Sequence, residues 1–214
     1  MIKLSLSAQD MTCSRNNQIL FSAINFNLSE GHILHIRGEN GIGKTTLLRC
    51  LAGISTFFSG KLLWEGENIF DSESYQRQLY FLGHRNTVKS ALTAKENLLF
   101  ALNCVKPSAE QIDRRLKQVD LYPKATQLAG TFSAGQKQRL AIAKLLLSET
   151  KVWILDEPFT SLDLAGTELL QQIMIEHQIE QGIIIFTSHF LTMTDYVSYQ
   201  ELKLVPVQPS DTRF

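Results

Sequence analysis

The loop from Gly38 to Thr45 limits the fold of this chain more strongly than any other part of its sequence. Its residues are Gly38, Glu39, Asn40, Gly41, Ile42, Gly43, Lys44 and Thr45, with Thr46 directly after them. A short apolar run at 33–36 precedes the loop, and a helical pattern of leucines follows it. Glycines let backbone N–H groups approach an anion closely, and the start of a helix carries partial positive charge. Strand, loop and helix therefore predict the first unit of a nucleotide-binding sheet, with phosphate held by this loop.

Two side chains of this loop have separate expected roles. The Lys44 ammonium supplies a point charge to the β- and γ-phosphates, and the Thr45 hydroxyl is a ligand for Mg²⁺. The residues match the pattern G-x4-G-K-[ST] in full, so we expect the whole loop and Thr46 to line the nucleotide. The pattern alone leaves the reaction open, because small GTPases, nucleotide kinases and helicases share it.

A second motif combines a buried strand with two acidic residues. Residues 152–155 are Val-Trp-Ile-Leu, and Asp156 and Glu157 follow directly. A parallel strand of this kind ends at the same edge of the sheet as the phosphate loop. We expect Asp156 to hold Mg²⁺, directly or through water. Glu157 is then the candidate general base that polarises the attacking water.

The hydrophobic periodicity predicts an α/β fold. Alternation or short apolar runs indicate strands at 2–8, 24–28, 33–36, 62–64, 69–70, 80–82, 152–155 and 183–186. Capping-box spacings at Thr93 and Ser108 open helices, and a helical stripe runs from Leu169 to His177. We expect a largely parallel sheet core, an antiparallel ribbon around the turn at 65–67, and a helical subdomain at about 86–147. The subdomain is inserted into a single domain that spans residues 1–214.

Composition narrows the classes of partner. Lys and Arg number 21 and so do Asp and Glu, so no global field attracts nucleic acid or anionic lipid. No apolar stretch approaches the roughly 18 residues of a bilayer span, and the first residues lack a secretory pattern. We therefore expect a cytosolic chain that reaches a membrane through another protein. Cys13, Cys50 and Cys104 are widely spaced, without a CxxC pair, which indicates reduced thiols rather than zinc or disulfides.

The stretch Ser133-Ala134-Gly135-Gln136 resembles the signature of the ABC transporter ATP-binding family, usually Leu-Ser-Gly-Gly-Gln. Further matches follow in chain order: Pro158 after the acidic pair, Ser161-Leu162-Asp163 like the D-loop, and His189 like the switch histidine. The resemblance implies ATP as substrate, with Mg²⁺, and a two-fold homodimer formed through ATP. The signature residues of one copy would contact the γ-phosphate held by the other, and Asp163 would lie where the D-loop crosses the interface. His189 would reach the γ-phosphate and help to position water.

Two positions depart from the pattern of this family. Gly83-His84 stands where a glutamine usually senses Mg²⁺ and contacts the membrane partner. Imidazole can accept a hydrogen bond from Mg²⁺-bound water, so we keep His84 as a candidate catalytic and metal-site residue. Arg15 stands near the aromatic residue that usually stacks on adenine, and a guanidinium plane can also stack on a base. Phe132 replaces the usual leucine before the signature serine.

Within the family, the chain closely resembles the ATP-binding subunits of bacterial haem exporters in cytochrome c maturation. The resemblance rests on Ala134, Gly83-His84, the segment 92–98 and the run 153–160. It implies integral membrane permease subunits as partners, a peripheral position on the cytoplasmic face of the inner membrane, and haem delivery to, or release from, a periplasmic haem chaperone. We assign the histidines to nucleotide chemistry or to the surface, and expect no direct haem ligand.

Several rival functions stay open at this point. An ABC ATPase subunit for another exported cargo would carry the same motifs, and only the resemblance to haem exporter subunits argues against it. A non-transport ABC ATPase would carry a long coiled-coil insertion or a second ATPase domain. A GTPase or kinase would carry a guanine-reading Asn-Lys-x-Asp motif or an arginine-rich lid, and the sequence contains neither.

Overall fold

A computed structural model describes residues 4–15, 18–56, 58–83, 88–101, 106–188 and 199–206. The chain forms two compact units. The first, here called the sheet unit, comprises Met1–Phe81, Thr150–Asp156 and Glu176–Phe214. The second, here called the helical unit, comprises Leu82–Glu149 and Glu157–Ile175.

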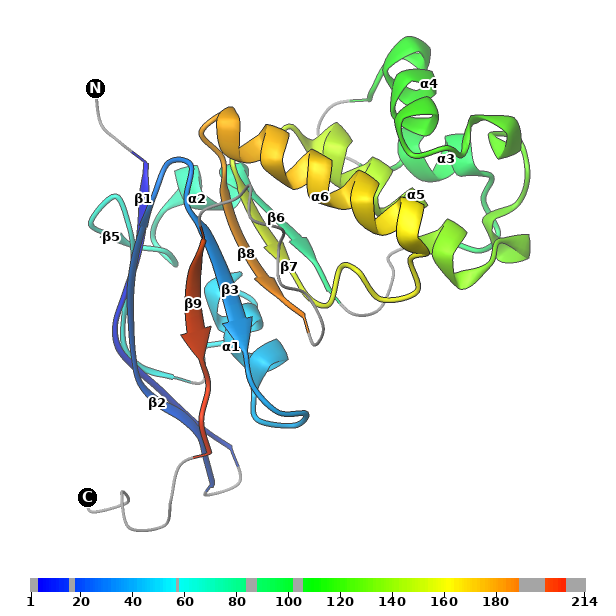
Figure 1. The fold of residues 1–214 in the computed structure, drawn as a ribbon. Coiled ribbons are helices and arrows are strands. Elements are labelled where there is room, and N and C mark those ends of the chain that lie inside the picture. The colour runs from blue at the N-terminus through cyan, green and yellow to red at the C-terminus, as the bar shows by residue number, and fades with distance from the viewer. Residues whose placement is uncertain are drawn as a thin grey trace. The chain divides into compact units, whose positions relative to one another are not determined.

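A sheet with parallel strands carries the phosphate loop. Its order is β6-β7-β8-β3-β9, formed by Leu79–Leu82, Val152–Leu155, Ile183–Thr187, Ile33–Arg37 and Gln200–Lys203 (Figure 1). β3 pairs in parallel with β8 on one side and with β9 on the other, and β8 also pairs in parallel with β7. All residues of β7 and β8 are buried, as expected for strands covered on both faces. The predicted parallel core is confirmed, and β9 is a strand that the sequence pattern did not indicate.

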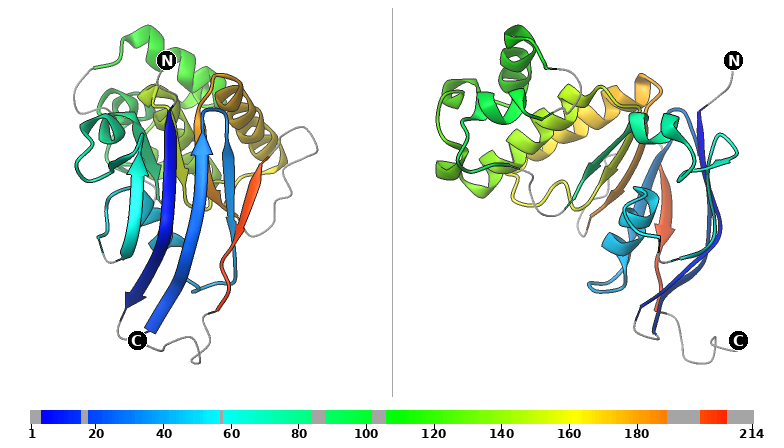
Figure 2. Two further views of the ribbon diagram at one scale, coloured as in Figure 1. Left: turned by 90° about the vertical axis from the view of Figure 1, so that its left-hand side faces the viewer. Right: turned by 180° about the vertical axis from the view of Figure 1, so that it is seen from behind.

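An antiparallel sheet forms the second layer of the sheet unit. Its order is β2-β1-β4-β5, formed by Gln18–Ser29, Ser5–Arg15, Ser59–Trp64 and Glu67–Asn68; the left view of Figure 2 shows β4, β1 and β2 side by side. The predicted ribbon at 62–70 is therefore part of a larger sheet, because β1 pairs with both β2 and β4. Register shifts between Ala8 and Cys13 bend β1 against β2.

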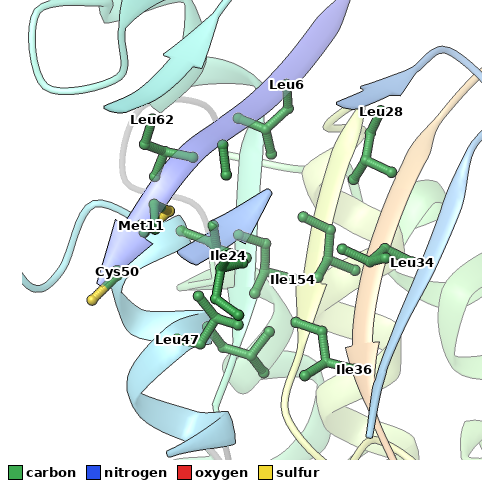
Figure 3. Packing of buried hydrophobic residues seen from close by; sticks show 14 of the residues in the cluster. Leu6, Met11, Ile24, Leu28, Leu34, Ile36, Leu47, Cys50, Leu62 and Ile154 are labelled. Carbon is green, nitrogen blue, oxygen red and sulfur yellow. The ribbon is translucent and has the colours of Figure 1, made fainter. Parts of the chain in front are cut away.

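The hydrophobic core of the sheet unit lies between its two sheets. Helix α1, Lys44–Leu51, contributes Leu47, Leu48, Cys50 and Leu51 to this core. Figure 3 shows Leu47 and Cys50 among side chains from the antiparallel sheet, such as Leu6, and from the parallel sheet, such as Ile154. A short helix, α2 (Glu73–Gln78), is capped at its N-terminus by Ser72, whose hydroxyl accepts a hydrogen bond from the Tyr75 N–H. The core therefore holds the start of α1, and with it the phosphate loop, against both sheets.

Helices dominate the other unit. They are α3 (Ala94–Leu99), α4 (Ala109–Gln118), α5 (Ala134–Ser148) and α6 (Leu164–Ile179) up to Ile175, with 3-10 turns at Tyr122–Lys124 and Ala129–Thr131. Complete capping boxes open α3 at Thr93, α4 at Ser108 and α5 at Ser133, so the helix starts predicted at Thr93 and Ser108 are confirmed. On α6, the expected stripe is buried at Leu170, Ile173 and Met174. Within the described ranges, no helix is both long enough and apolar enough to cross a bilayer.

Candidate nucleotide-binding site

The phosphate loop runs from the end of β3 to the start of α1. Gly41 and Gly43 have φ values of 81° and 109°, in the left-handed region where L side chains are strained. A Cβ at Gly41 would meet nothing within 4 Å, so the backbone conformation itself explains the glycine there. At Gly43 a Cβ would also lie 3.2 Å from the Leu20 Cβ. The loop therefore turns as a phosphate-binding loop must.

Lys44 lies over this loop, with its side chain largely buried. Its Nζ donates hydrogen bonds to the Gly38 carbonyl at 2.8 Å and to the Glu39 carbonyl at 3.1 Å. The residue is 7% exposed, so the ammonium is fixed by the backbone rather than free in solvent. A cation held in this way is placed for phosphate oxygens that enter the loop.

Asp156 joins the phosphate loop to the two neighbouring strands of the sheet. The Thr45 hydroxyl donates to its Oδ2 at 2.9 Å, although 111 positions separate the two residues in sequence. The Thr187 hydroxyl, at the end of β8, donates to its Oδ1 at 2.9 Å. Asp156 is 4% exposed. Each of its two carboxylate oxygens accepts a hydrogen bond from one hydroxyl group. The structure brings together Thr45 and Asp156, two of the three residues that the sequence assigned to Mg²⁺; the third, His84, lies outside the described residues.

The donor set at this point suits Mg²⁺ bound with a nucleotide. Thr45 and Asp156 offer hard oxygen atoms, which Mg²⁺ prefers, and it commonly takes one or two protein ligands and completes its shell with phosphate and water. Among the described residues, no group of three or more His, Cys, Asp or Glu side chains forms a dedicated metal cage. The residues present therefore fit a metal that arrives with its phosphates.

The signature residues lie at the start of α5 in the helical unit. The Ser133 hydroxyl accepts from the Gln136 N–H at 3.2 Å, and the Gln136 side chain accepts from the Ser133 N–H at 3.1 Å. Ser133 and Ala134 are exposed, and Gly135 is partly exposed. A Cβ at Gly135 would lie 2.7 Å from the carbonyl oxygen of Ser161, so only glycine fits this approach of two backbones. The capping box leaves the helix start facing outward.

The D-loop residue Asp163 is tied to the same helix. Its Oδ1 accepts from the Gly166 N–H at 2.8 Å and from Arg139 Nη2 at 3.0 Å. These two donors, the Gly166 amide first, hold the pKa of the Asp163 carboxyl below its usual value. A buried Gln138 side chain further donates to the Pro158 carbonyl at 2.7 Å. Signature helix and D-loop are therefore one hydrogen-bonded assembly within the helical unit.

Glu157 begins the turn after β7 and has a positive φ of 52°. Its carbonyl accepts from the Thr160 N–H at 3.1 Å, which closes the turn. Seven other non-glycine residues of the described ranges, among them Glu65 and Glu149, also have a positive φ, so this conformation belongs to the turn and does not by itself assign a role to Glu157. Glu157 is partly exposed.

For three predicted site residues the structure describes no side chain. His84 and His189 lie outside the described residues, and of Arg15 only the backbone, at the end of β1, is described. Cys104 also lies outside them, whereas Cys13 and Cys50 are buried free thiols. Burial raises the pKa of the Cys50 thiol to about 11.

Two features of the described residues were missed or misplaced from sequence. Thr187 was not singled out, although a hydroxyl directly after an apolar strand was a usable signal. The expectation that the remaining histidines lie on the surface is wrong for His35 and His177, which are 0% and 8% exposed. His35 lies within the apolar run at 33–36 and His177 ends the helical stripe that begins at Leu169, so the apolar pattern around each of them was a usable signal of burial.

Known proteins resemble the chain over most of its length. The family model described as ABC transporter matches residues 21–160. The cytochrome c biogenesis ATP-binding export protein CcmA of Shewanella frigidimarina is 44% identical over 185 residues, which cover 86% of each chain. The protein of the same name from Photobacterium profundum is 38% identical, covering 93% of this chain and 99% of its own.

Solved structures show the same fold. An ABC transporter ATP-binding protein from Pyrococcus furiosus superposes with a TM-score of 0.82 at 22% identity, covering 94% of this chain and 97% of its own. A second structure, titled as the ATP-binding subunit of an ABC transporter, gives a TM-score of 0.81 at 25% identity and covers 93% and 85%.

Proposed function

The chain belongs to the ABC transporter family, and we propose that it is the ATP-hydrolysing subunit of a haem exporter complex that serves cytochrome c biogenesis. That it binds ATP follows from the family. The cargo is proposed from the relatives named as cytochrome c biogenesis export proteins and from the resemblance of the sequence to haem exporter subunits.

The hydrogen bond between Thr45 and Asp156 is the observation that supports hydrolysis most directly. It joins the phosphate loop to the strand that ends in the acidic pair. In this arrangement Thr45 Oγ1 and Asp156 would hold Mg²⁺, which neutralises phosphate charge when bound. Lys44 binds the β- and γ-phosphates from the loop. Glu157 accepts the proton of the attacking water as general base.

The other half of each site comes from a second copy in this proposal. Ser133, Ala134, Gly135 and Gln136 start a helix whose N–H groups and dipole favour an anion. They contact the γ-phosphate bound to the phosphate loop of the partner. Because Asp163 is bonded to the same helix through Arg139, the D-loop moves with the signature when the pair opens after hydrolysis.

The remaining site residues complete the proposal. His189 would contact the γ-phosphate and position water, His84 would accept a hydrogen bond from water on a bound Mg²⁺, and Arg15 would stack on the base. The partners are integral membrane permease subunits, with the chain peripheral on the cytoplasmic face of the inner membrane. ATP turnover then drives haem delivery or release to a periplasmic chaperone, without a haem ligand from this chain.

Substitution of Glu157 tests the hydrolytic part of the proposal. In the complex purified from membranes, Glu157→Gln removes the proton acceptor but keeps the shape of the side chain. We expect unchanged ATP affinity and a fall in turnover of at least about a hundredfold. Glu168→Gln, an exposed acid on α6, is the matched control and should keep the parent rate. Near-normal hydrolysis by the Glu157 variant would reject the base assignment.

The identity of the membrane partner tests the cargo. Affinity purification from membranes should recover a permease whose complex with this chain binds haem. Haem should stimulate ATP turnover, or its transfer by the complex should depend on ATP turnover. Recovery of a permease for another solute, with an active ATPase, would reject haem export while leaving the enzymatic assignment in place.

A further inference from the structure

His35 is a polar residue inside an otherwise apolar strand. β3 reads Ile-Leu-His-Ile-Arg, and its first four residues are all buried. Burial of an imidazole costs free energy unless its polar atoms find partners. His35 is 0% exposed and lies in β3, three positions before Gly38 and the phosphate loop. The groups that contact the imidazole therefore indicate the role of this side chain.

The imidazole contacts both neighbouring strands. It stacks on Phe186 of β8, with ring centroids 4.4 Å apart and planes 6° from parallel. It meets Tyr199, just before β9, edge-on at 6.0 Å. Its Nε2 lies 3.4 Å from the carbonyl oxygen of Ser188, directly after β8. One side chain thus touches the residue at 188 and the residue at 199, on either side of the segment 189–198.

The tautomer follows from these partners. A carbonyl oxygen only accepts, so Nε2 carries the proton and donates to Ser188. Nδ1 faces the Glu201 carboxylate at 3.9 Å, and Glu201 in turn accepts from Arg37 at 3.2 Å. Burial holds the pKa of His35 below its usual value, so the ring stays neutral with Nε2 protonated near pH 7.

The contact joins two segments that matter for the proposed reaction. Ser188 is the residue from which the chain continues to His189, and β3 is the strand that continues into the phosphate loop. We propose that His35 is a positioning residue for ATP hydrolysis, which fixes the Ser188 carbonyl against the strand that carries the phosphate loop. The inference rests on the proposed function and extends it to a buried residue outside the phosphate loop.

Two variants separate the hydrogen bond from the packing. His35→Phe keeps a ring to stack on Phe186 but removes the donor to Ser188. His35→Gln removes the ring but keeps an N–H that can reach the same carbonyl. In the membrane-purified complex we expect His35→Phe to lower kcat about tenfold with ATP affinity within about twofold of the parent. His35→Gln should restore kcat to within about threefold of the parent. Thermal unfolding checks that both variants are folded at the assay temperature.

A second comparison asks whether His35 acts through the residue after Ser188. In a His189→Ala background, His35→Phe should lower kcat by less than about twofold, because the residue it positions is gone. A full tenfold loss in that background would overturn the proposal, and so would parent-like kcat in His35→Phe or equal losses in the Phe and Gln variants. An inactive parent complex would instead contradict the proposed function itself.

Discussion

Among the single residues outside the nucleotide site, His177 has the most unusual environment. Its ring stacks on Trp153 with centroids 3.6 Å apart and planes 5° from parallel, and its Nε2 bonds the Lys151 carbonyl at 3.2 Å. Burial, partly offset by that hydrogen bond, lowers the pKa of His177 to about 4. The folded protein therefore keeps this ring neutral over a range in which an unfolded chain would protonate it.

This environment predicts a loss of stability in acid. The unfolded state takes up a proton at His177 as the pH falls through about 6.5, whereas the folded state does so only near 4. Between pH 7.5 and 4.5 the free energy of unfolding should fall by about 2 to 3 kcal/mol from this group alone. Urea unfolding at both pH values measures it. His177→Phe keeps the stack and cannot titrate, so its loss should be smaller by that amount; equal losses would contradict the assignment.

At the residue scale, the sequence indicated the site residues that form local patterns along the chain. The spacing of Gly38 to Thr45 and the strand before Asp156 are local patterns, and the structure brings Thr45 and Asp156 into contact. His35 and His177 lie on predicted apolar elements, but their stacking partners Phe186 and Trp153 are on other strands, so the sequence did not indicate these contacts.

At the scale of elements, β4 lies so close to its antiparallel neighbour β1 that one position admits only glycine. Gly60 has φ +92°, and a Cβ there would lie 2.5 Å from the Asp10 carbonyl oxygen and 2.6 Å from that of Gln9. The pairing of β1 with β4 shifts register just after Gln9. Gly66, in the turn between β4 and β5, has a similar φ of +85° but meets nothing within 4 Å.

These two glycines give a matched pair of substitutions. Gly66→Ala should cost about 1 kcal/mol through left-handed strain alone. Gly60→Ala carries the same strain and a backbone clash, so it should cost at least about 2 kcal/mol more. Chemical denaturation of both variants measures the difference. Similar costs would mean that β1 moves away from β4 without penalty.

Helix starts were the most predictable elements. The capping boxes at Thr93, Ser108 and Ser133 are complete within four residues, so short-range sequence contains all of their partners. β9 escaped prediction because Gln-Glu-Leu-Lys has no apolar run, and only its pairing with β3 makes it a strand. The sequence indicated only a ribbon within the antiparallel sheet, because the pairing of β1 with β2 on one side and β4 on the other is not visible in any local pattern.

At the scale of the whole molecule, the proposed reaction needs two copies. A pair formed from one Lys44→Ala chain and one Ser133→Arg chain has a single seam in which Lys44 and Ser133 are both intact. Each variant alone should be inactive, whereas an equal mixture should recover up to about a quarter of the parent ATP turnover. The double variant mixed with either single variant has no intact seam and is the control. No recovery in the mixture would place both residues at a site within one copy.

The pairing of β3 bears on how the molecule is made. The strand that leads into Gly38 takes its neighbours from Ile183–Thr187 and Gln200–Lys203, which are synthesised long after it. While the ribosome is still translating the middle of the chain, the nascent phosphate loop has neither flanking strand of its sheet. Nucleotide capture therefore has to wait until both of these strands have been made, and a product terminated before Ile183 lacks the support to compete for ATP.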